Sequence, residues 1–532
     1  MTYTLQKQLK YAMAFYSTHV IPRLQKNKSI GISAAVIMSL IYLFRERVMK
    51  PPKQLRHIPH INFFSVFRSL FTGESFWERA YRVVIPLIDS PKSNGLFLET
   101  GRYGWELYVC NPEDAKRVFL KQDLFPKYPV TDGVENTLLT KFITGENMIM
   151  AEGARWKSQR KVANPAFRRS MPVKLFGQLT QEMFVAMESM DEIINVTDLM
   201  QRWTLDAIGK AGFGFEFNAI SDLNSEWVKT YEKVGTSIDE PLFFIFPKLD
   251  REYLWLFPKR VKAHKEADKL LNMIDNVIEN KRELLLRGET SNDALEENEK
   301  DLLTLMLESE NRGEGAMSNL ELKGNICAFF LAGHDTTSSS LSFAIHYLAQ
   351  NQEIQQRARE EAIAILGDEP VDVFPTVEET KQMNYIHQIM KETMRINGPI
   401  PTVVPRVATE DTELSGTFVP KGTLVNVSIF NIHHSEKYWK NSHEFNPDRF
   451  APGGEADTNA QDGISWLPFG YGGRQCIGMN FSLNEQRVLL SMLLRKYSWT
   501  TPQNSIHKDR VVSTGMAVIV TYELDIKFKK RY

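Results

Sequence analysis

The chain has 532 residues, of which 43% are hydrophobic and 24% are charged, and its formal net charge is −1. No fixed-period repeat is visible, which excludes a solenoid or a propeller. The near-zero charge provides no basic field for nucleic acid. Three cysteines are too few for a disulfide framework and suit a reducing compartment.

The amino terminus contains the one compositional break, an uncharged apolar run at positions 29–44. As a helix this run extends about 24 Å, which is short of a typical hydrocarbon core, but the flanking Lys28 and Arg45 can reach the interfaces. A buried helix and a cleaved signal peptide are the alternatives. No small-residue cleavage site follows the run. We therefore expect residues 1–50 to form an N-terminal membrane-anchor region.

Residues 51–60 contain Pro51, Pro52 and Pro59 and predict a stiff connector. We expect residues 61–532 to form one domain, mainly α with small β-sheets. Its expected helices, read from apolar periodicity, span 152–160, 178–192, 261–285, 319–349, 352–366, 377–395 and 482–496. Alternating side chains predict strands at 104–109, 423–429 and 516–522.

In the first of these helices, Trp156 and Arg160 lie one turn apart. Their indole N–H and guanidinium suit two donors that bind one carboxylate; a half-buried tryptophan beside a surface arginine is the alternative. Farther along, the apolar run 319–349 is interrupted by Ala332, Gly333, His334, Asp335 and two threonines. Glycine and paired threonines are disfavoured inside helices, and such local exceptions often mark functional sites.

Glu392 and Arg395 are spaced to pair on one helix face. The proline-rich stretch that follows, positions 399–405, predicts an extended path leading to Arg406. Taken alone, the first segment is a routine surface ion pair, and the second is better explained as a surface turn with a solvated arginine. Cys110 and Cys327 belong to no such motif, and we expect them in the core.

The most informative segment leads to Cys476 and reads Phe469-Gly-Tyr-Gly-Gly-Arg474-Gln-Cys476-Ile-Gly478. Three glycines permit tight turns. The cysteine then stands where a helix begins, so backbone N–H groups and the helix dipole favour a thiolate. Gly478 leaves space for a flat group, and Arg474 is placed to pair with an anionic part of it. An isolated buried cysteine explains none of these fixed offsets.

This segment resembles the haem loop of the cytochrome P-450 superfamily, Phe-x-x-Gly-x-Arg-x-Cys-x-Gly, with Phe469, Gly472, Arg474, Cys476 and Gly478 at the five fixed positions. The resemblance implies the cytochrome P-450 fold, with haem between a long central helix and the cysteine loop, and Cys476 as the thiolate ligand of the iron. It extends to four further segments in the same order. Their implied cofactor-binding residues are Trp156, Arg160, Ala332, Gly333, Arg406, Phe469, Arg474 and Gly478.

By the same resemblance, Asp335 and Thr336 are the catalytic pair that relays protons, and His334 occupies a variable, non-ligating position. Glu392, Arg395 and Arg449 correspond to a buried structural triad, although Asp448 stands where glutamate is more usual. The resemblance also implies a substrate-lining set, composed of Phe142, Ile143, Thr402, Val403, Thr514 and Met516.

The implied activity is hydroxylation of an apolar small molecule (a steroid, terpenoid, fatty acid or xenobiotic) with O2. No flavin or dinucleotide fingerprint is present, so we expect electrons from NADPH through NADPH-cytochrome P-450 reductase, with cytochrome b5 as a second candidate partner. Two interpretations are open for a group of cationic residues: a surface that receives the reductase, or a solvated flank of the helix. The group consists of Lys157, Lys161, Arg168 and Arg169. We expect one N-terminal anchor in the endoplasmic reticulum membrane and a cytosolic catalytic domain.

Two other functions are compatible with a haem-thiolate fold. One is an isomerase or dehydratase that needs no external electrons, against which Thr336 and Asp335 argue because they suit an oxygen proton relay. The other is a non-enzymatic haem sensor or carrier, in which a second protein ligand would close the iron.

Overall fold

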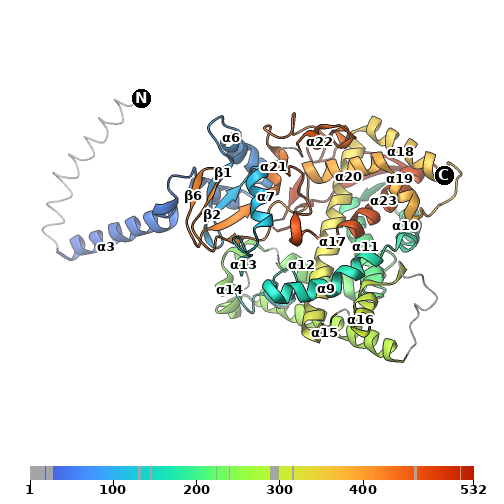
Figure 1. Ribbon diagram of the computed structural model, residues 1–532, viewed down its shortest axis with the longest axis horizontal. Helices are drawn as coiled ribbons and strands as arrows, with labels where there is room; N and C mark the ends of the chain where they lie inside the picture. Colours follow the sequence, from blue (N-terminus) through green and yellow to red (C-terminus); the bar gives the residue numbers. More distant parts are fainter. Residues whose placement is uncertain are drawn as a thin grey trace.

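A computed structural model describes residues 18, 28–129, 134–143, 147–222, 225–238, 240–287, 299–313, 315, 317–459, 464–515 and 517–532. Most of the described chain is helical, and the larger β-sheet lies toward the side from which the amino-terminal helix α3 extends (Figure 1). The expectation of a mainly α fold with small sheets is therefore confirmed.

The longer helices of the body are α7 (Pro112–Leu120), α9 (Gly153–Arg169), α10 (Val173–Glu188), α11 (Val196–Ala207), α12 (Glu226–Ile238), α15 (Pro258–Leu286), α16 (Leu302–Asn311), α17 (Asn319–Gln350), α18 (Gln352–Leu366), α20 (Asn384–Ile396) and α23 (Met479–Lys496). Shorter helical segments include α4 (Phe63–Thr72), α5 (Phe76–Arg79), α6 (Ile85–Ile88), α8 (Leu138–Ile143), α13 (Pro241–Ile245), α14 (Pro247–Arg251), η6 (Leu254–Leu256), α19 (Val377–Gln382), α21 (Ile429–His434), η8 (Pro447–Phe450), α22 (Glu455–Asn459) and η9 (Gly472–Arg474). Two π-helical turns, η4 (Ala80–Val84) and η5 (Ile208–Phe213), continue α5 and α11.

The largest sheet has the strand order β1-β2-β7-β4. Its strands are β1 (Leu96–Gly101), β2 (Gly104–Val109), β4 (Arg406–Val407) and β7 (Leu424–Val427). β2 pairs parallel to β7 with Glu106 opposite Leu424, and β4 pairs antiparallel to β7 with Arg406 opposite Val425. This sheet therefore joins strands from both ends of the chain, with Arg406 on its edge strand β4 beside β7.

Within the described residues, three smaller sheets complete the β part: β3-β11-β8, β10-β9 and β5-β6. Their strands are β3 (Ile193–Asn195), β5 (Thr412–Leu414), β6 (Thr417–Val419), β8 (Tyr497–Thr500), β9 (Ser513–Thr514), β10 (Val520–Thr521) and β11 (Asp525–Lys530).

Helix α17 runs through the centre of the helical body (Figure 1). It begins with a capping box in which Ser318 and Glu321 satisfy each other's backbone N–H groups. At 32 residues it is about 48 Å long. The largest core cluster includes side chains from α9, α10, α11, α17, α20 and α23. Cys110 and Cys327 are both buried, as expected.

One predicted helix is two helices in the structure. The continuous helix expected over 377–395 is divided at Met383 (φ −75°, ψ 70°) into α19 and α20. The Glu361 carboxylate on α18 accepts from the backbone N–H groups of Tyr385 and Ile386, at 2.7 and 2.8 Å. Because free N–H groups in a first helical turn need acceptors, this distant cap stabilises a new helix start that the local pattern does not reveal.

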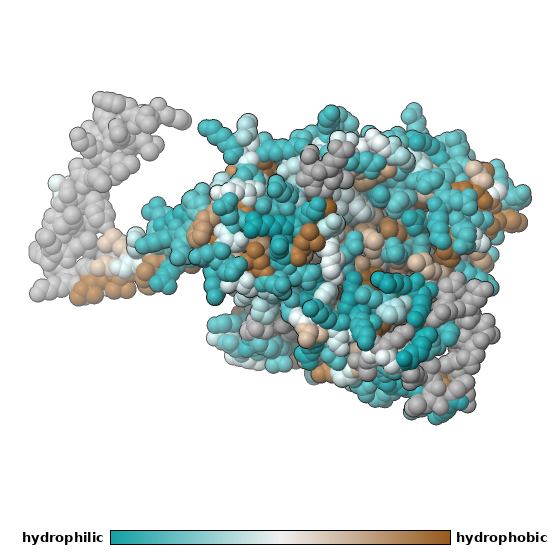
Figure 2. All heavy atoms as spheres, in the orientation of Figure 1, coloured by the Kyte–Doolittle hydropathy of each residue, from teal (hydrophilic) through white to brown (hydrophobic). Residues whose placement is uncertain are grey.

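At the amino terminus, helix α3 (Lys28–Phe44) carries exposed apolar side chains, which form the brown surface of this helix in Figure 2. No helix within the described residues combines the length and hydropathy that a membrane crossing requires. The predicted anchor also includes residues 1–17 and 19–27, which lie outside the described residues.

Candidate functional site

The cysteine loop is closed by backbone hydrogen bonds. The Cys476 N–H donates to the Phe469 carbonyl at 2.9 Å, and the Gln475 N–H donates to the Gly472 carbonyl at 3.0 Å. Gly470 and Gly472 have φ of 66° and 72°, which only glycine adopts at little cost. A Cβ on Gly472 would lie 3.2 Å from Leu120 Cδ2, so the loop also packs closely on α7. Helix α23 begins three residues after the cysteine, with Gly478 as its N-cap.

Cys476 is an exposed residue, although protein surrounds its thiol group. Burial raises the pKa of this thiol, while the Gly478 N–H and the charge of Arg160 lower it. The predicted effect of the backbone N–H groups is present, since the Gly478 N–H favours the thiolate, although burial has the larger effect on this pKa. A metal cation coordinated to Cys476 would favour the thiolate further.

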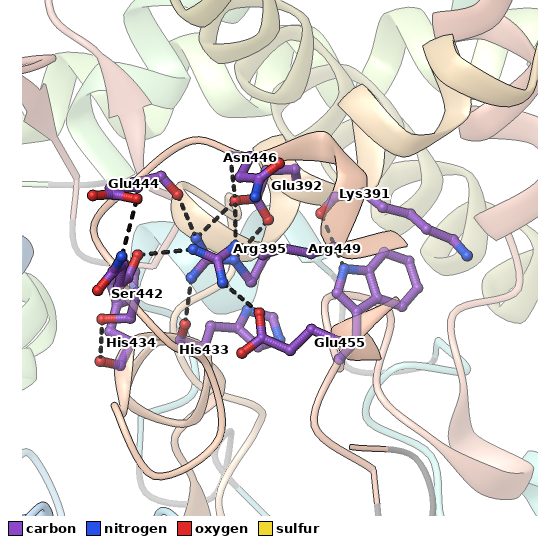
Figure 3. A network of polar contacts seen from close by, with 12 residues as sticks. Lys391, Glu392, Arg395, His433, His434, Ser442, Glu444, Asn446, Arg449 and Glu455 are labelled. Atoms are coloured by element: carbon purple, nitrogen blue, oxygen red, sulfur yellow. Dashed lines mark hydrogen bonds and ion pairs between the residues drawn. The ribbon is translucent and has the colours of Figure 1, made fainter. Parts of the chain in front are cut away.

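The triad expected from the sequence is present in the structure (Figure 3). Arg395 donates through Nε and Nη2 to the two Glu392 oxygens at 2.7 and 2.9 Å, and Arg449 Nε donates to Glu392 Oε1 at 3.2 Å. Relative exposure is 0% for Glu392 and Arg395 and 5% for Arg449. Arg449 also pairs with Glu455 of α22, a fourth member that the sequence motif does not include.

The triad is connected to the cysteine loop through His433. Arg395 Nη1 donates to the His433 carbonyl at 2.7 Å, and His433 Nε2 accepts from the Leu467 N–H at 2.9 Å. The Trp466 indole N–H donates to the Lys391 carbonyl at 3.1 Å, a bond visible in Figure 3. Since the Leu467 carbonyl then accepts from Gly470, the triad fixes the start of the loop that carries Cys476.

Four cationic side chains gather near the cysteine loop: Lys127, Arg160, Arg406 and Arg474. Arg160 Nη2 donates to the Gln475 carbonyl at 3.0 Å. Arg474 donates to the Ala151 carbonyl, pairs with Glu152 at 2.7 Å and lies over the Trp156 ring at 4.0 Å. Arg406 Nη1 donates to the Phe125 carbonyl, and Lys127 Nζ donates to the Ile149 carbonyl.

The charges in this cluster do not balance within the described part of the chain. Glu152 acts on Lys127, Arg406 and Arg474, and its one negative charge leaves a positive excess. Desolvation lowers the pKa of Lys127 to about 7, with Arg474 and Arg406 contributing, and lowers that of Arg406 to about 10. Arg406 Nε is buried without a hydrogen-bond partner. A group with two carboxylates supplies both the missing charge and the missing acceptor, so these residues fit haem propionates.

The central helix α17 is accessible to solvent at the segment whose sequence is unusual for a helix. Ala332 is exposed and Gly333, Asp335 and Thr336 are half-buried, although residues 326–330 and 337–345 on either side are buried. The Thr337 hydroxyl lies 3.0 Å from the Ser482 hydroxyl of α23, which joins this part of α17 to the helix that follows Cys476. An accessible patch in the middle of a core helix therefore lies beside the helix that Cys476 precedes.

Gly333 has a packing role that the sequence does not reveal. A Cβ there would lie 2.9 Å from Ile208 Cδ1 of η5. The small size of residue 333 thus permits close packing of α17 on η5, whereas the sequence attributes it to cofactor approach. A cofactor contact at Gly333 stays a prediction.

Asp335 and Thr336 are adjacent but make different contacts. Tyr231 of α12 donates its hydroxyl to both Asp335 oxygens, at 3.1 and 3.2 Å. The Thr336 hydroxyl donates to the Ala332 carbonyl, one turn earlier, at 2.6 Å. His334 is buried with Nδ1 2.9 Å from the Thr204 hydroxyl of α11.

The expected substrate-lining residues are dispersed. Phe142 has no exposed surface and belongs to the largest core cluster with Ile143, and a substrate contact at either residue stays a prediction. Thr402 and Val403 are half-buried at the edge of the larger sheet. Thr514 is exposed on β9, and Met516 lies outside the described residues.

Sequence reasoning missed Lys127 and Tyr231. Lys127 lies in a short loop segment with no motif around it, and Tyr231 is one aromatic residue on an amphipathic helix. Both reach the site through contacts between segments far apart in sequence, which no local pattern encodes.

Comparison with known proteins shows to which family the chain is similar. Residues 106–528 match the family model described as Cytochrome P450. The chain is 30% identical to "Cytochrome P450 3A12" of Canis lupus familiaris over 66% of this chain and 69% of that protein. It is 29% identical to "Taurochenodeoxycholic 6 alpha-hydroxylase" of Sus scrofa, covering 73% and 75%, and 27% identical to "11-oxo-beta-amyrin 30-oxidase" of Medicago truncatula, covering 90% and 94%.

Proposed function

Because this chain belongs to the cytochrome P-450 family and is therefore a haem-thiolate oxidoreductase, we propose that it hydroxylates an apolar small molecule with O2 and electrons delivered by a reductase. One observation carries the proposal. The accessible Ala332–Thr336 patch on the central helix, the Cys476 thiol and an uncompensated cation cluster are connected through α23 and the cysteine loop.

Haem bound at this site supplies the activation of dioxygen, which a thiolate ligand promotes by donating electron density to the iron. Cys476 is the residue that would hold the haem iron through its sulfur. Arg406 offers its unpartnered Nε to a propionate, and Lys127, Arg160, Arg474 and the Trp156 indole are the other proposed propionate partners. Phe469 and Gly478 border the cysteine on the two sides of the loop.

The proposed proton relay consists of Asp335 and Thr336. Asp335 is a carboxylate at the boundary between the core and the accessible patch, which allows it to exchange protons with water. The Thr336 hydroxyl donates to a carbonyl and so keeps its lone pairs available to accept a proton. The need for such a relay separates an oxygenase from the isomerase and dehydratase alternative.

We propose that the electrons come from NADPH through a separate reductase that docks on α9. Lys157, Lys161 and Arg168 are exposed on this helix, and Arg160 of the same helix contacts the cysteine loop. A cationic surface this close to Cys476 offers a short path for electron transfer and attracts an acidic partner. Cytochrome b5 is a second candidate for the same surface.

The proposed location is the endoplasmic reticulum membrane, with the catalytic domain in the cytosol. The exposed apolar side chains of α3, among them Ile37, Leu40 and Ile41, support contact with lipid. The Phe44 ring lies 6.2 Å from that of Phe63 in α4, so α3 joins the body at an apolar contact.

A polycyclic substrate is the first class to test, because two relatives are named for reactions on taurochenodeoxycholic and 11-oxo-beta-amyrin compounds. Thr402 and Val403 are the proposed contacts in the described part of the chain; Phe142, Ile143, Thr514 and Met516 stay predictions.

The test is a titration of the purified haem protein with steroids, triterpenoids and fatty acids while the Soret band is recorded. A blue shift followed by NADPH-dependent formation of a hydroxylated product supports the proposal. Product formation without NADPH would support the isomerase or dehydratase. A haem sensor would be supported by three results together: a Soret band that no compound shifts, an iron closed by a second protein ligand, and no NADPH consumption with any compound.

A further inference from the structure

The turn that joins β1 to β2 carries an arginine that has no hydrogen-bond acceptor and no ion-pair partner within the described residues. Arg102 is half-buried in this turn, and its Nε is buried without an acceptor. Because Nε alone among its nitrogens is both buried and unpartnered, Nη1 and Nη2 keep exposed surface. A guanidinium has only donors, and a buried donor without an acceptor costs free energy. The chain itself therefore leaves Arg102 incompletely satisfied.

Two aromatic rings hold the guanidinium in place. Arg102 Cζ lies 4.9 Å from the centroid of the Phe244 ring of α13 and 5.5 Å from that of Tyr103. Tyr103 in turn packs on Tyr128, with ring centroids 5.2 Å apart. An aromatic ring attracts the positive charge but offers no lone pair to the N–H groups. The rings thus fix the position of the charge and leave its donors available to a ligand.

The position of Phe244 is fixed by its neighbour Phe243. Phe243 is 5% exposed, and its ring centroid lies 4.3 Å from Arg260 Cζ. Arg260 donates to the two Asp250 oxygens at 2.6 and 2.8 Å, and both side chains are buried. Because this ion pair holds α13 on α14 and α15, the aromatic surface beside the guanidinium exists before any ligand binds, which lowers the cost of binding.

The two elements that border Arg102 both lead to the candidate site. α13 lies next to the larger sheet and follows α12, whose Tyr231 contacts the central helix α17 (Figure 1). On the other side, the Tyr128 N–H donates to the Pro405 carbonyl at 2.7 Å, one residue before Arg406. Arg102 is therefore a cation at the border of the site, between the elements that reach its accessible patch and those that carry its proposed propionate contacts.

The carboxylate beside this turn does not neutralise Arg102. Glu106 lies close to the turn, since a Cβ on Gly101 would be 2.6 Å from its Oε1. Its side chain is buried and accepts from Asn426 Nδ2, and burial raises the pKa of Glu106 to about 7. Glu106 therefore belongs to the interior of the sheet, and the positive charge of Arg102 remains for a ligand.

We propose that Arg102 binds the carboxylate of an apolar substrate whose other end reaches the Ala332–Thr336 patch. The planar fork of an arginine binds a carboxylate at two points, and the adjoining rings suit the apolar carbons next to it. The inference rests on the proposed hydroxylase function and names its substrate class, a fatty acid or a polycyclic acid with one carboxylate. Hydroxylation is then expected at carbons far from that carboxylate.

The experiment titrates the haem-loaded protein at pH 8, where carboxylic acids are ionised, and derives Kd from the Soret band. The probes are lithocholic acid, oleanolic acid and palmitic acid, each compared with its own methyl ester. We expect Arg102→Met to lower the ratio of ester Kd to acid Kd about 10- to 100-fold, the equivalent of one hydrogen bond to a charged group. Unchanged ester affinity shows that the variant is folded.

Two further variants separate geometry from general charge. Arg102→Lys should retain part of the ratio, because the charge remains and the two-point fork is lost. Lys248→Met is the matched control, since Lys248 is an exposed cation on α14, close to the segment that contacts Arg102. A ratio that falls equally in Lys248→Met and Arg102→Met would mean that the acids respond only to overall charge, and the inference would be overturned.

Product analysis distinguishes failure of this inference from failure of the proposed function. In the wild-type protein the acids should be hydroxylated far from the carboxylate, and Arg102→Met should scatter the positions. If NADPH-dependent products form while the ratio and the positions are unchanged in Arg102→Met, the carboxylate site is refuted and the hydroxylase stands. An acid preference that depends on Arg102 without NADPH-dependent product supports the site and contradicts the hydroxylase.

Phosphatidylcholine vesicles with and without phosphatidic acid test a lipid phosphate as the anion instead. If Arg102→Met weakens sedimentation with the phosphatidic acid vesicles and leaves the ester-to-acid ratio unchanged, Arg102 binds lipid and the inference is overturned. Equilibrium dialysis with radiolabelled palmitate detects binding that does not shift the Soret band. Equal palmitate binding by the wild-type protein and Arg102→Met would likewise overturn it.

Discussion

The Glu392 carboxylate and the Arg395 guanidinium form a two-point ion pair that is completely buried, with N–O distances of 2.7 and 2.9 Å. Isolated buried charges are costly, and this pair is stable because each remaining polar atom finds a partner. Glu392 also accepts from Arg449 and from the Asn446 N–H, and Arg395 donates to the His433 and Glu444 carbonyls. The network thereby holds three segments of the chain together.

Removing Glu392 should destabilise the protein strongly. Glu392→Gln leaves the buried Arg395 without a carboxylate and Arg449 with Glu455 alone, for which we expect a loss of about 3–5 kcal/mol in the free energy of unfolding. Urea unfolding with and without haem measures it. Asp448→Asn is the control, because the Arg357–Asp448 pair is about half exposed and should cost at most about 1 kcal/mol. Equal losses in the two variants would contradict a special role for the triad.

Thr336→Ala should uncouple electron use from product formation. The variant removes the hydroxyl that accepts a proton at the accessible patch, so we expect product per NADPH to fall severalfold while peroxide rises. Asp335→Asn should lower the rate of product formation about 100-fold, as for loss of a general acid. Ser340→Ala is the control, because its hydroxyl also donates to a helix carbonyl but lies buried one turn away. Unchanged coupling in Thr336→Ala would favour the isomerase or dehydratase.

The sequence predicts the parts of this site that are local in the chain. The Cys476 loop, the Glu392–Arg395 spacing and the span of α17 each follow from motifs or periodicity within one segment. The division of the 377–395 helix does not, because Glu361 caps α20 from another helix. Lys127 and Tyr231 were missed for the same reason, since their partners lie on segments far away in sequence.

Gly333→Ala tests whether this glycine serves packing or the cofactor. The added methyl group would meet Ile208 Cδ1, so we expect a destabilisation of about 1–3 kcal/mol in the haem-free protein. Ile208→Val removes that methyl group and should restore most of the loss in the double variant. Thermal unfolding and haem content are measured together. If Ile208→Val restores stability but haem is still lost, the cofactor role of Gly333 is supported.

Charge changes on α9 should affect the reductase and leave haem binding intact. Lys157→Gln with Lys161→Gln removes two exposed charges, which should raise the KM for reductase and flatten its dependence on ionic strength. Lys116→Gln with Lys121→Gln is the control, with two exposed lysines on and just after α7. If turnover responds equally to both pairs of substitutions, the proposal that the reductase docks on α9 is contradicted.

Because of Lys127, we expect the free energy of unfolding of the haem-free protein to be larger at high pH than at low pH. Burial and neighbouring arginines lower its pKa to about 7, while the unfolded chain keeps the ordinary value of 10.5. Between these values the unfolded state binds a proton that the folded state has lost, so the free energy of unfolding rises with pH, by at most about 1.4 kcal/mol per pH unit. Lys127→Met should lack this rise and Lys121→Met should keep it, as followed by urea unfolding from pH 6 to pH 10. Haem with ionised propionates supplies the missing negative charge, so the difference between Lys127→Met and the wild-type protein should shrink once haem is bound; a difference that stays the same would place Lys127 away from the propionates.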